Sequence, residues 1–342
     1  MRIAMYYSNR DVRIAEMPVP RIGAGEILIK VHASGICGSD VMEWYRRDRV
    51  PLVLGHEIGG EIAQVGEGVK NYRAGDRITA AHHVPCDTCR YCLAGHSTLC
   101  ETLRKTSFDP GGFAEYLRLA PINVERGVFL LPDELSYEEA TFIEPLACVL
   151  RGQRQAGLKP GMSVLVLGSG IAGLLHIKLA KALGAGRIIA TDLNDYRLNA
   201  AKRFGAEAVI KASENVPEKV RKLNGGLEAD LVILCTGAVP AINQAFQSVE
   251  PGGTILFFAP TDPGVTIPFS INDVFWRRDV TLTTTYAGSP ADYATAMELI
   301  RAGRVTVKEL ITHRLPMKEA GLGFKLVAEA KESIKVIILP QK

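Results

Sequence analysis

The chain has 342 residues, 47% of them apolar and 23% charged, and a formal net charge of +3, which together predict a soluble globular protein of about two domains. The small net charge argues against a nucleic acid or a charged membrane surface as a partner, and no apolar run approaches the roughly 20 residues of a membrane span. Because the first residues also lack the apolar core of a signal peptide, we expect a cytoplasmic protein.

The first 125 residues contain short alternating or apolar runs that are separated by glycine and proline. Runs of this kind, bounded by turn residues, are typical of short β-strands. The clearest strand candidates are residues 26–32, 60–65 and 77–81. Many short strands joined by glycine turns predict an all-β region that forms a small barrel or a folded sheet.

Two motifs in this region carry the residue types of a zinc site: Cys37-Gly-Ser-Asp40 and Gly55-His-Glu57. Thiolate, imidazole and carboxylate are ligands of zinc, and a site with three protein ligands leaves one position open for substrate or water. Taken alone, Cys37 is more often a buried apolar residue and His56 a hydrogen-bonded core histidine. The two motifs together form a candidate catalytic zinc site.

Four of the seven cysteines form a separate cluster, Cys86-x-x-Cys89-x-x-Cys92 followed by Cys100. Four thiolates at this spacing suit a closed tetrahedral site that holds a structural zinc ion. Disulfides are disfavoured in the reducing compartment that we expect for this chain. The sequence therefore predicts an exposed loop that is held together by zinc.

The next motif, in residues 163–192, has the pattern of a strand–turn–helix–strand unit. An apolar run ends at Leu167, a glycine-rich turn follows, residues 174–183 resemble a helix, and a second apolar run ends at Asp192. The turn is Gly168-Ser-Gly170-Ile-Ala-Gly173. Its first glycine allows a tight bend, the second lets the backbone approach a pyrophosphate, and the third lets helix and strand pack closely.

Asp192 lies about 20 residues beyond the glycines, where an acidic side chain accepts hydrogen bonds from both ribose hydroxyls of NAD. A glycine-rich turn alone is weak evidence, but strand, helix and acid together indicate a dinucleotide. We therefore expect NAD as the cofactor, with these residues at its site: Gly168, Gly170, Ile171, Ala172, Gly173, Asp192 and Arg197. Arg197 can also accept the 2′-phosphate of NADP, although a place on the helix surface is the simpler interpretation.

Beyond residue 205, apolar runs alternate with helical stretches, which predicts a parallel, doubly wound sheet. A helix after residue 141 is expected to connect the two domains. The further strand candidates are residues 208–210, 230–235, 253–258, 280–285 and 333–339, and the helix candidates are residues 214–223, 238–248, 291–302 and 317–330.

Together, these motifs resemble those of the zinc-dependent medium-chain alcohol and polyol dehydrogenases. The resemblance rests on Cys37-Gly-Ser-Asp40, on the glycine-spaced Gly55-His-Glu-x-x-Gly60-x5-Gly66, on the four cysteines and on the dinucleotide unit, and it covers nearly the whole chain. It implies an α/β fold in which a β-rich, GroES-like catalytic domain is interrupted by a Rossmann domain with a doubly wound parallel sheet. We place the catalytic domain at residues 1–150 and 285–342, and the NAD-binding domain at residues 151–284.

The segment that bridges the two domains resembles that of the polyol branch of the family. Alcohol dehydrogenases of the family commonly have a cysteine as a zinc ligand there, whereas this chain has Glu144-Pro-Leu146, similar to sorbitol-type enzymes. The resemblance implies a catalytic zinc ion held by Cys37, His56, Glu57 and Glu144, directly or through water. Two alternatives stay open: Glu144 stabilises a helix N-terminus, or Cys148, one helical turn later, replaces it as a ligand.

The resemblance also implies roles for the neighbouring residues. Zinc would lower the pKa of the substrate hydroxyl, Ser39 would pass the hydroxyl proton outward, and the nicotinamide would accept the hydride. Asp40 would orient His56 by a hydrogen bond. Family members often have a histidine three residues after this serine, but this chain has Met42, so the proton needs another exit, such as water or the cofactor ribose.

The substrate pocket is the least specified part of the site. Trp44 can stack on a ring, and Arg46 or Arg49 can bind hydroxyls, a carboxylate or a phosphate, although a solvated basic loop or a subunit contact is the simpler interpretation. Sorbitol-type enzymes carry an Arg-Tyr pair in the pocket, of which this chain keeps at most Tyr286. We therefore expect a neutral, ring-shaped or linear polyol, with sorbitol itself in doubt.

The resulting expectation is an NAD-dependent zinc oxidoreductase that converts a polyol, cyclitol or secondary alcohol to a ketone or aldehyde. It would hold one catalytic and one structural zinc ion per chain, and the resemblance implies a homodimer or homotetramer. The nearer alternatives are enzymes of the same family that act on a hydroxy amino acid or a phosphorylated polyol. Threonine dehydrogenases of this kind typically have Asp-Pro where this chain has Glu144-Pro145. A non-catalytic nucleotide-binding protein is the alternative from another class, and the intact zinc motifs argue against it.

Overall fold

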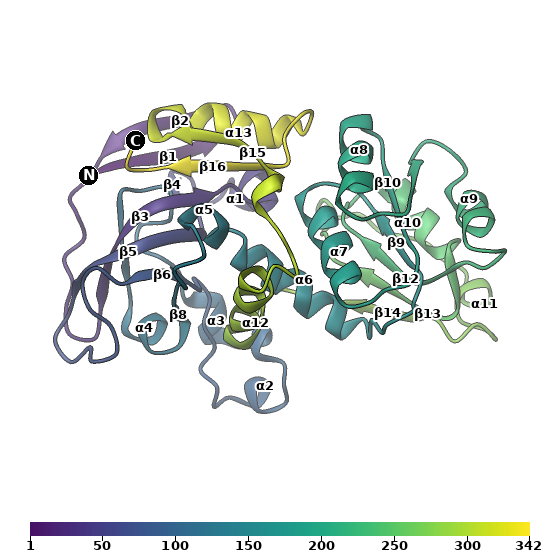
Figure 1. Cartoon of the computed structure of the whole chain (residues 1–342), viewed down its shortest axis with the longest axis horizontal. Coiled ribbons are helices and arrows are strands. Elements are labelled where there is room, and N and C mark those ends of the chain that lie inside the picture. The colour runs from purple at the N-terminus through teal and green to yellow at the C-terminus, as the bar shows by residue number, and fades with distance from the viewer. The chain divides into compact units, whose positions relative to one another are not determined.

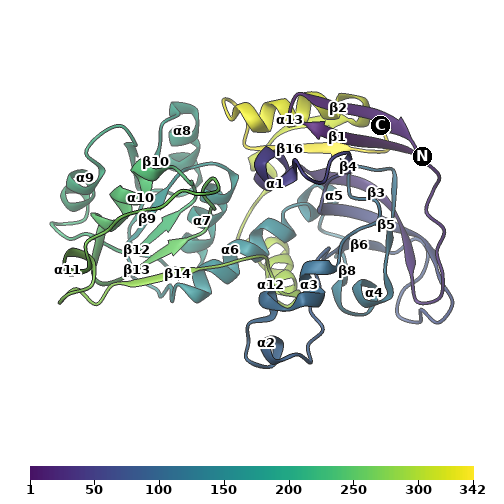
Figure 2. The ribbon, with the colours of Figure 1, turned by 180° about the vertical axis from the view of Figure 1, so that it is seen from behind.

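The computed structural model describes all 342 residues and divides them into two compact units (Figures 1 and 2). The first unit comprises Met1–Ala147 and Ala287–Lys342, and the second is the uninterrupted segment Cys148–Tyr286. Each unit has its own sheet structure and its own apolar core. None of the helices combines the length and the apolar character that crossing a lipid bilayer requires.

The first unit is built on a mostly antiparallel sheet. Its strands are β3 (Ile27–Gly35), β5 (Glu57–Val65), β6 (Arg77–Ala80), β7 (Tyr116–Leu119), β8 (Val128–Leu130), β15 (Ile311–Pro316) and β16 (Lys335–Leu339). Their order across the sheet is β15-β16-β3-β5-β6-β8, and β7 also pairs with β3. Alternate side chains such as Ile29 and Val31 on β3 and Ile62 on β5 are fully buried in the core. Figure 1 shows β16, in yellow, beside β3, in purple, so the last strand of the chain pairs with one of the first.

A smaller sheet and several short helices complete this unit. The sheet has the order β2-β1-β4, with the bounds Asp11–Glu16, Arg2–Ser8 and Leu52–Val53. The helical segments are η1 (Gly38–Val41), α1 (Glu43–Arg46), α2 (Arg90–Leu93), η2 (Ser97–Leu99), α3 (Glu101–Lys105), α4 (Pro121–Gly127), α5 (Tyr137–Ala140), α12 (Pro290–Arg301), η3 (Lys308–Leu310), η4 (Met317–Glu319) and α13 (Ala320–Glu329). The prediction that the first 125 residues are all-β was therefore wrong in part. The segments that it missed, η1 to α4, are too short for an apolar period to show in the sequence.

The second unit contains a six-stranded sheet in which all pairs are parallel. Its strands are β9 (Val164–Leu167), β10 (Ile188–Asp192), β11 (Ala208–Lys211), β12 (Ala229–Leu234), β13 (Val249–Phe257) and β14 (Thr281–Thr284). Its helices are α7 (Ile171–Ala182), α8 (Asp195–Phe204), α9 (Val216–Leu223), α10 (Val239–Phe246) and α11 (Ile271–Val274). The helix expected to connect the domains is α6 (Ile143–Gln155).

The strand order of the second unit, β11-β10-β9-β12-β13-β14, reverses direction between β9 and β12. Dinucleotides bind at such a switch point, in the crevice outside the carboxyl ends of the strands. Leu167, the last residue of β9, pairs with Thr191 on one side and with Leu234 on the other. The glycine-rich turn after Leu167 therefore lies at this crevice. The predicted doubly wound parallel sheet is confirmed.

Polar caps explain where two of the helices begin. The side chain of Asn194 accepts a hydrogen bond from the Tyr196 N–H at the start of α8. At the start of α12, the N-cap Ser289 and Asp292, the third residue of the helix, form a reciprocal capping box. Each cap satisfies an N–H group that would otherwise lack a partner in the first turn of the helix.

Candidate active site and metal centres

The pairing of β3 with β5 brings three possible metal ligands together. Cys37 follows the end of β3, Glu57 is the first residue of β5, and Gly35 lies opposite Glu57 in the register of the two strands. The donor atoms of Cys37, His56 and Glu57 all lie within 4.8 Å of one another. This set fits a zinc ion with one position left open, because soft thiolate, imidazole and carboxylate are its usual ligands. We call these three residues the catalytic cluster.

The backbone before His56 explains why a glycine precedes it. Gly55 has φ +100°, in the region that side chains rarely adopt. A Cβ atom there would also lie 2.7 Å from the backbone nitrogen of Phe113 and 2.9 Å from the Gly112 backbone. Any other residue would push the loop away from its neighbour and displace the His56 imidazole from the cluster.

Asp40 lies behind the catalytic cluster and is fully buried. Its Oδ2 accepts a hydrogen bond from the Cys37 N–H at 3.0 Å, and its Oδ1 lies 3.5 Å from His56 Nδ1. Burial raises the pKa of Asp40, although His56, the Cys37 N–H and Arg46 favour its ionised form. A carboxylate behind a ligating imidazole fixes the orientation of the ring and makes it a better donor.

The surroundings of His56 suit a cation. Burial alone would lower the pKa of His56, but Asp40, Cys37 and Glu144 raise it well above its usual value. An environment that favours a positive charge on the ring also favours a metal ion beside it. Because Glu144 is one of the groups that raise the pKa of His56, its carboxylate lies near the catalytic cluster. Glu144 is the second residue of α6 and 8% exposed, but it is not one of the three residues of the 4.8 Å group.

Sequence analysis missed a lysine at the catalytic cluster. Lys335, the first residue of β16, is fully buried and its Nζ forms an ion pair with Glu57 Oε2. The ammonium group also lies 5.5 Å from the centre of the Phe142 ring. Lys335 and the catalytic cluster therefore share the Glu57 carboxylate. The only signal in the sequence was a lysine at the start of the apolar run that forms β16.

Two further residues that sequence analysis missed, His82 and His83, follow β6. The His82 ring lies 4.8 Å from the His56 ring and 3.8 Å from the His83 ring, measured between centroids. Burial lowers the pKa of both, well below the usual value for His82 and to about 4 for His83. Both are therefore neutral at pH 7, and the His83 Nδ1–H donates to the Thr106 carbonyl at 2.8 Å. Two neutral imidazole rings, those of His82 and His83, therefore pack beside the catalytic cluster.

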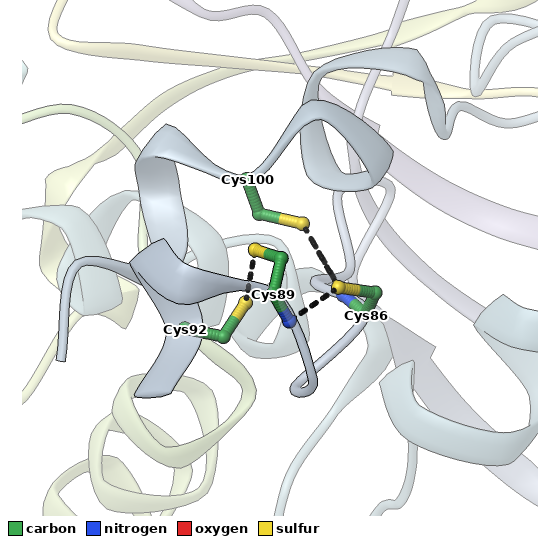
Figure 3. Close-up of side chains that lie close together, drawn as sticks. All are labelled: Cys86, Cys89, Cys92 and Cys100. Carbon is green, nitrogen blue, oxygen red and sulfur yellow. Dashed lines mark hydrogen bonds between the residues drawn. The ribbon is translucent and has the colours of Figure 1, made fainter. Parts of the chain in front are cut away.

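The four cysteines of the second cluster converge as Figure 3 shows. The Sγ atoms of Cys86 and Cys100 are 3.6 Å apart, and those of Cys89 and Cys92 are 3.5 Å apart. Four thiolates about 2.3 Å from a zinc ion in a tetrahedron lie about 3.8 Å from one another, so the arrangement fits the ion closely. Hydrogen bonds from the backbone and side chain of Thr88 lower the pKa of the Cys86 thiol to about 6, which favours the thiolate that zinc binds.

The glycine-rich turn of the second unit has the geometry of a phosphate-binding turn. Gly168 has φ +95°, and a Cβ at Gly173 would lie 2.0 Å from the Gly168 carbonyl oxygen, so helix and strand meet there only through glycine. Gly170 is the N-cap of α7, which leaves the N–H groups of Ile171 and Ala172 at the start of that helix. Unpaired N–H groups at a helix N-terminus attract a pyrophosphate.

Asp192 and Arg197 lie on either side of this turn. The Asp192 carboxylate accepts hydrogen bonds from the Ser169 N–H and the Asn194 N–H, both at 2.9 Å. Arg197 lies over Gly170, because its Nη1 would be 3.7 Å from a Cβ placed there. A carboxylate and a guanidinium therefore both lie beside the glycine-rich turn.

The residues suggested for the substrate pocket lie in different surroundings. Trp44 is half-buried on α1, and Arg49 is exposed and stacks on the Tyr45 ring with 5.2 Å to its centre. The Arg46 guanidinium also lies over the Tyr45 ring, 4.7 Å from its centre, and its Nη2 lies 3.7 Å from Asp40 Oδ1. Tyr286 is the last residue of the second unit and 47% exposed.

Both units match known protein families. Residues 23–132 match the alcohol dehydrogenase GroES-like domain, and residues 172–302 match the zinc-binding dehydrogenase family. A sorbitol dehydrogenase of Bacillus subtilis (strain 168) is 32% identical, with 100% of this chain and 98% of that protein covered. An L-threonine 3-dehydrogenase of Bacillus licheniformis is 33% identical, with 95% and 94% covered. A solved structure from Sinorhizobium meliloti 1021 that is bound to NADP has a TM-score of 0.88 and 26% identity, with 99% of both chains covered.

Proposed function

This chain belongs to the zinc-binding dehydrogenases with an alcohol dehydrogenase GroES-like domain, and on this basis we propose that it transfers a hydride from a polyol, cyclitol or secondary alcohol to NAD, giving a ketone or an aldehyde. The observation that carries the proposal is the catalytic cluster, in which a thiolate, an imidazole and a carboxylate lie within 4.8 Å of one another. Three such donors bind zinc and leave a position for the substrate oxygen. The broader activity, oxidoreduction of an alcohol or polyol, follows from family membership.

We assign substrate activation to one domain and cofactor binding to the other. We assign residues 1–150 and 285–342 to the catalytic domain, because the catalytic cluster lies in the first unit. We assign residues 151–284 to NAD binding, because the glycine-rich turn and Asp192 lie in the second unit.

Cys37, His56, Glu57 and Glu144 would hold the catalytic zinc ion, with Glu144 bound directly or through water. The ion would act as a Lewis acid and lower the pKa of the alcohol hydroxyl. Asp40 holds the imidazole of His56 in place. Ser39, two residues after the ligand Cys37, would pass the hydroxyl proton outward by accepting it while giving up its own. The thioether of Met42 cannot pass that proton on, so it leaves through water or the cofactor ribose.

The cofactor is held by backbone and carboxylate groups. The N–H groups of Ile171 and Ala172 bind the pyrophosphate, which the glycines allow to come close. Asp192 accepts hydrogen bonds from the ribose hydroxyls of NAD, and its negative charge repels the 2′-phosphate of NADP. The related structure from Sinorhizobium meliloti is bound to NADP; in this chain we propose that the choice between NAD and NADP depends on Asp192 and Arg197.

We propose a neutral polyol or secondary alcohol rather than an anionic substrate. The charge of Arg46 is matched by Asp40, and Arg49 is exposed and stacked on Tyr45. Identity to the curated relatives does not separate substrates, because the sorbitol and threonine enzymes are 32% and 33% identical to this chain. Glu144, where threonine enzymes of the family typically have aspartate, favours the polyol.

The test is a substrate screen with the zinc-loaded protein and NAD. Neutral polyols, cyclitols and secondary alcohols are compared with L-threonine and with a phosphorylated polyol, and Cys37→Ser serves as the inactive control. We expect the highest kcat/KM for a neutral polyol or secondary alcohol. A preference for threonine or for the phosphorylated polyol would replace our substrate class, and tight NAD binding without turnover of any alcohol would indicate a non-catalytic protein.

We also propose a homodimer or homotetramer in the cytoplasm. Ile271 and Trp276, in the second unit, are 63% and 65% exposed, and apolar side chains of this size are what a subunit contact covers. All seven cysteines are free thiols, as a reducing compartment would keep them. Sedimentation of the purified protein at two concentrations tests the oligomeric state, and a monomer at both would contradict it.

A further inference from the structure

We propose that Arg46 is a positioning residue for the catalytic metal site. Its guanidinium group contacts two groups behind the site: the buried Asp40 carboxylate, which lies behind the ligand His56, and the carbonyl group of Ser39. The inference rests on the proposed catalytic zinc ion at Cys37 and His56. It gives Arg46 a place behind the site rather than in the substrate pocket.

The first observation is where the Arg46 side chain lies. It is only 12% exposed, whereas its neighbours Tyr45, on α1, and Arg47, the C-cap of α1, are exposed. Its Nη2 lies 3.7 Å from Asp40 Oδ1, and its Nε–H donates to the Ser39 carbonyl at 3.3 Å. Both groups belong to η1, the turn that directly follows the ligand Cys37. A planar guanidinium can face two acceptors at once in a fixed geometry. Here the Ser39 carbonyl is hydrogen-bonded, Asp40 Oδ1 is in ion-pair contact, and the guanidinium lies over the Tyr45 ring at 4.7 Å.

The second observation is that His56 and Arg46 both face Oδ1 of Asp40, which is buried and accepts no hydrogen bond from either of them. It lies 3.5 Å from His56 Nδ1 and 3.7 Å from Arg46 Nη2, while Oδ2 is bound to the Cys37 N–H. Asp40 has no exposure to water, and a buried carboxylate needs groups around it that compensate its charge. Arg46 is the only permanently charged group among these three neighbours. Without it, the carboxylate would move toward His56 and change the direction of the ring.

The third observation is that hydrogen bonds fix the backbone segment that precedes Arg46. Asn9, in the turn between β1 and β2, donates from Nδ2 to the Val41 carbonyl at 2.8 Å. The Asn9 backbone N–H donates to Glu43 Oε1, also at 2.8 Å. The end of η1 and the start of α1 are thus fixed to the same turn. Because this segment is fixed, the contact of Arg46 with Asp40 restricts the position of Asp40, and through it the orientation of the ligand His56.

The test compares wild type with Arg46→Met, which keeps most of the side-chain volume, and with Arg46→Lys, which keeps the charge. Arg47→Met, the same change at the exposed neighbour, is the matched control. The readout is the time course of zinc released from the holoenzyme to a chelator, together with kcat and the KM for NAD. We expect two phases of release, a fast one from the open catalytic site and a slow one from the four-cysteine site.

In Arg46→Met, the fast phase should accelerate about 10-fold, the lower end of the effect of losing an outer partner of a metal ligand. The slow phase and the KM for NAD should be unchanged, and kcat should fall. Arg46→Lys should lie between Arg46→Met and wild type, because one ammonium group cannot reach both Asp40 and the Ser39 carbonyl. The unchanged slow phase excludes general unfolding as the cause.

A fast phase and a kcat in Arg46→Met that match those of Arg47→Met would overturn the inference. So would a raised KM for the alcohol with unchanged zinc release, since that is the result expected of a substrate-binding arginine. If Arg46→Met does not fold, Arg46→Lys decides, and zinc release at the wild-type rate would then overturn it. Wild-type protein with a single zinc ion would instead contradict the proposed function itself.

Discussion

Lys335 shows what a single residue contributes to this site and why reading the sequence did not reveal it. The pair that it forms with Glu57 joins residues 278 positions apart, and no local pattern connects them. Cys37, His56 and Glu57 were visible because they belong to short motifs with characteristic neighbours. The same difference applies to His82, which was not singled out although its ring lies beside that of His56.

The buried pair gives a prediction for stability. In the zinc-free protein, replacing Lys335 with Met leaves the Glu57 carboxylate buried without its ammonium partner, which should lower the free energy of unfolding by about 3–5 kcal/mol. The double variant Lys335→Met/Glu57→Gln removes the unpaired charge and should recover part of that loss. Denaturant unfolding of the three proteins measures both effects, and equal stability of Lys335→Met and wild type would show that the pair is not formed.

Asp192 gives a prediction for cofactor choice. Asp192→Asn removes the charge and keeps one acceptor oxygen, so one of the two N–H groups that now bind Oδ2 and Oδ1, those of Ser169 and Asn194, keeps its partner. Without the repulsion of the 2′-phosphate, the ratio of kcat/KM for NAD to that for NADP should fall about 10-fold or more. Asp195→Asn, a nearby exposed acid paired with Lys211, is the control and should leave the ratio unchanged. Wild-type protein that uses both cofactors equally would refute the assignment.

At the scale of elements, periodicity and turn residues were sufficient for most strands and for the longer helices. The candidates at residues 26–32, 77–81 and 291–302 correspond to β3, β6 and α12. Two of the elements that were missed, α2 and α3, begin at cysteines of the four-cysteine cluster. Cys89 is the N-cap of α2 and Cys100 that of α3, and helices of four or five residues carry no repeating apolar pattern.

These short helices give a prediction for the four-cysteine loop. With few apolar side chains to bury, the loop depends on its metal, whose binding free energy is folding free energy. Cys100→Ala should lose one zinc ion per chain, lower the thermal midpoint and open the loop to proteolysis. Cys235→Ala, a cysteine of the second unit outside both clusters, should retain both ions. Protease resistance of Cys100→Ala equal to that of wild type would contradict a structural metal.

At the scale of the whole molecule, two kinds of inference were needed. The parallel sheet of the second unit follows from alternating apolar runs and helices. The return of the chain to the first unit does not, because nothing in residues 333–339 indicates that they pair with β3. That arrangement was expected only from the resemblance to a known family.

The whole chain should hold two zinc ions, one in each cluster of the first unit. The open cluster should lose its ion first and the four-cysteine cluster last, since four thiolates close the second site. Cys37→Ser should keep one ion and its fold but lose catalysis. Elemental analysis of freshly purified wild type and Cys37→Ser measures this, and one ion per wild-type chain would contradict the two-site interpretation.

The pairing of β16 with β3 has a consequence for synthesis on the ribosome. The second unit is one uninterrupted segment, so it can fold as a unit as soon as it has left the exit tunnel. The first unit must wait, because β16 brings Lys335 to Glu57 only after almost the whole chain has been translated. The nascent protein should therefore be able to bind the nucleotide before its alcohol site is complete, and a chain stalled before residue 335 would carry an unfinished catalytic cluster.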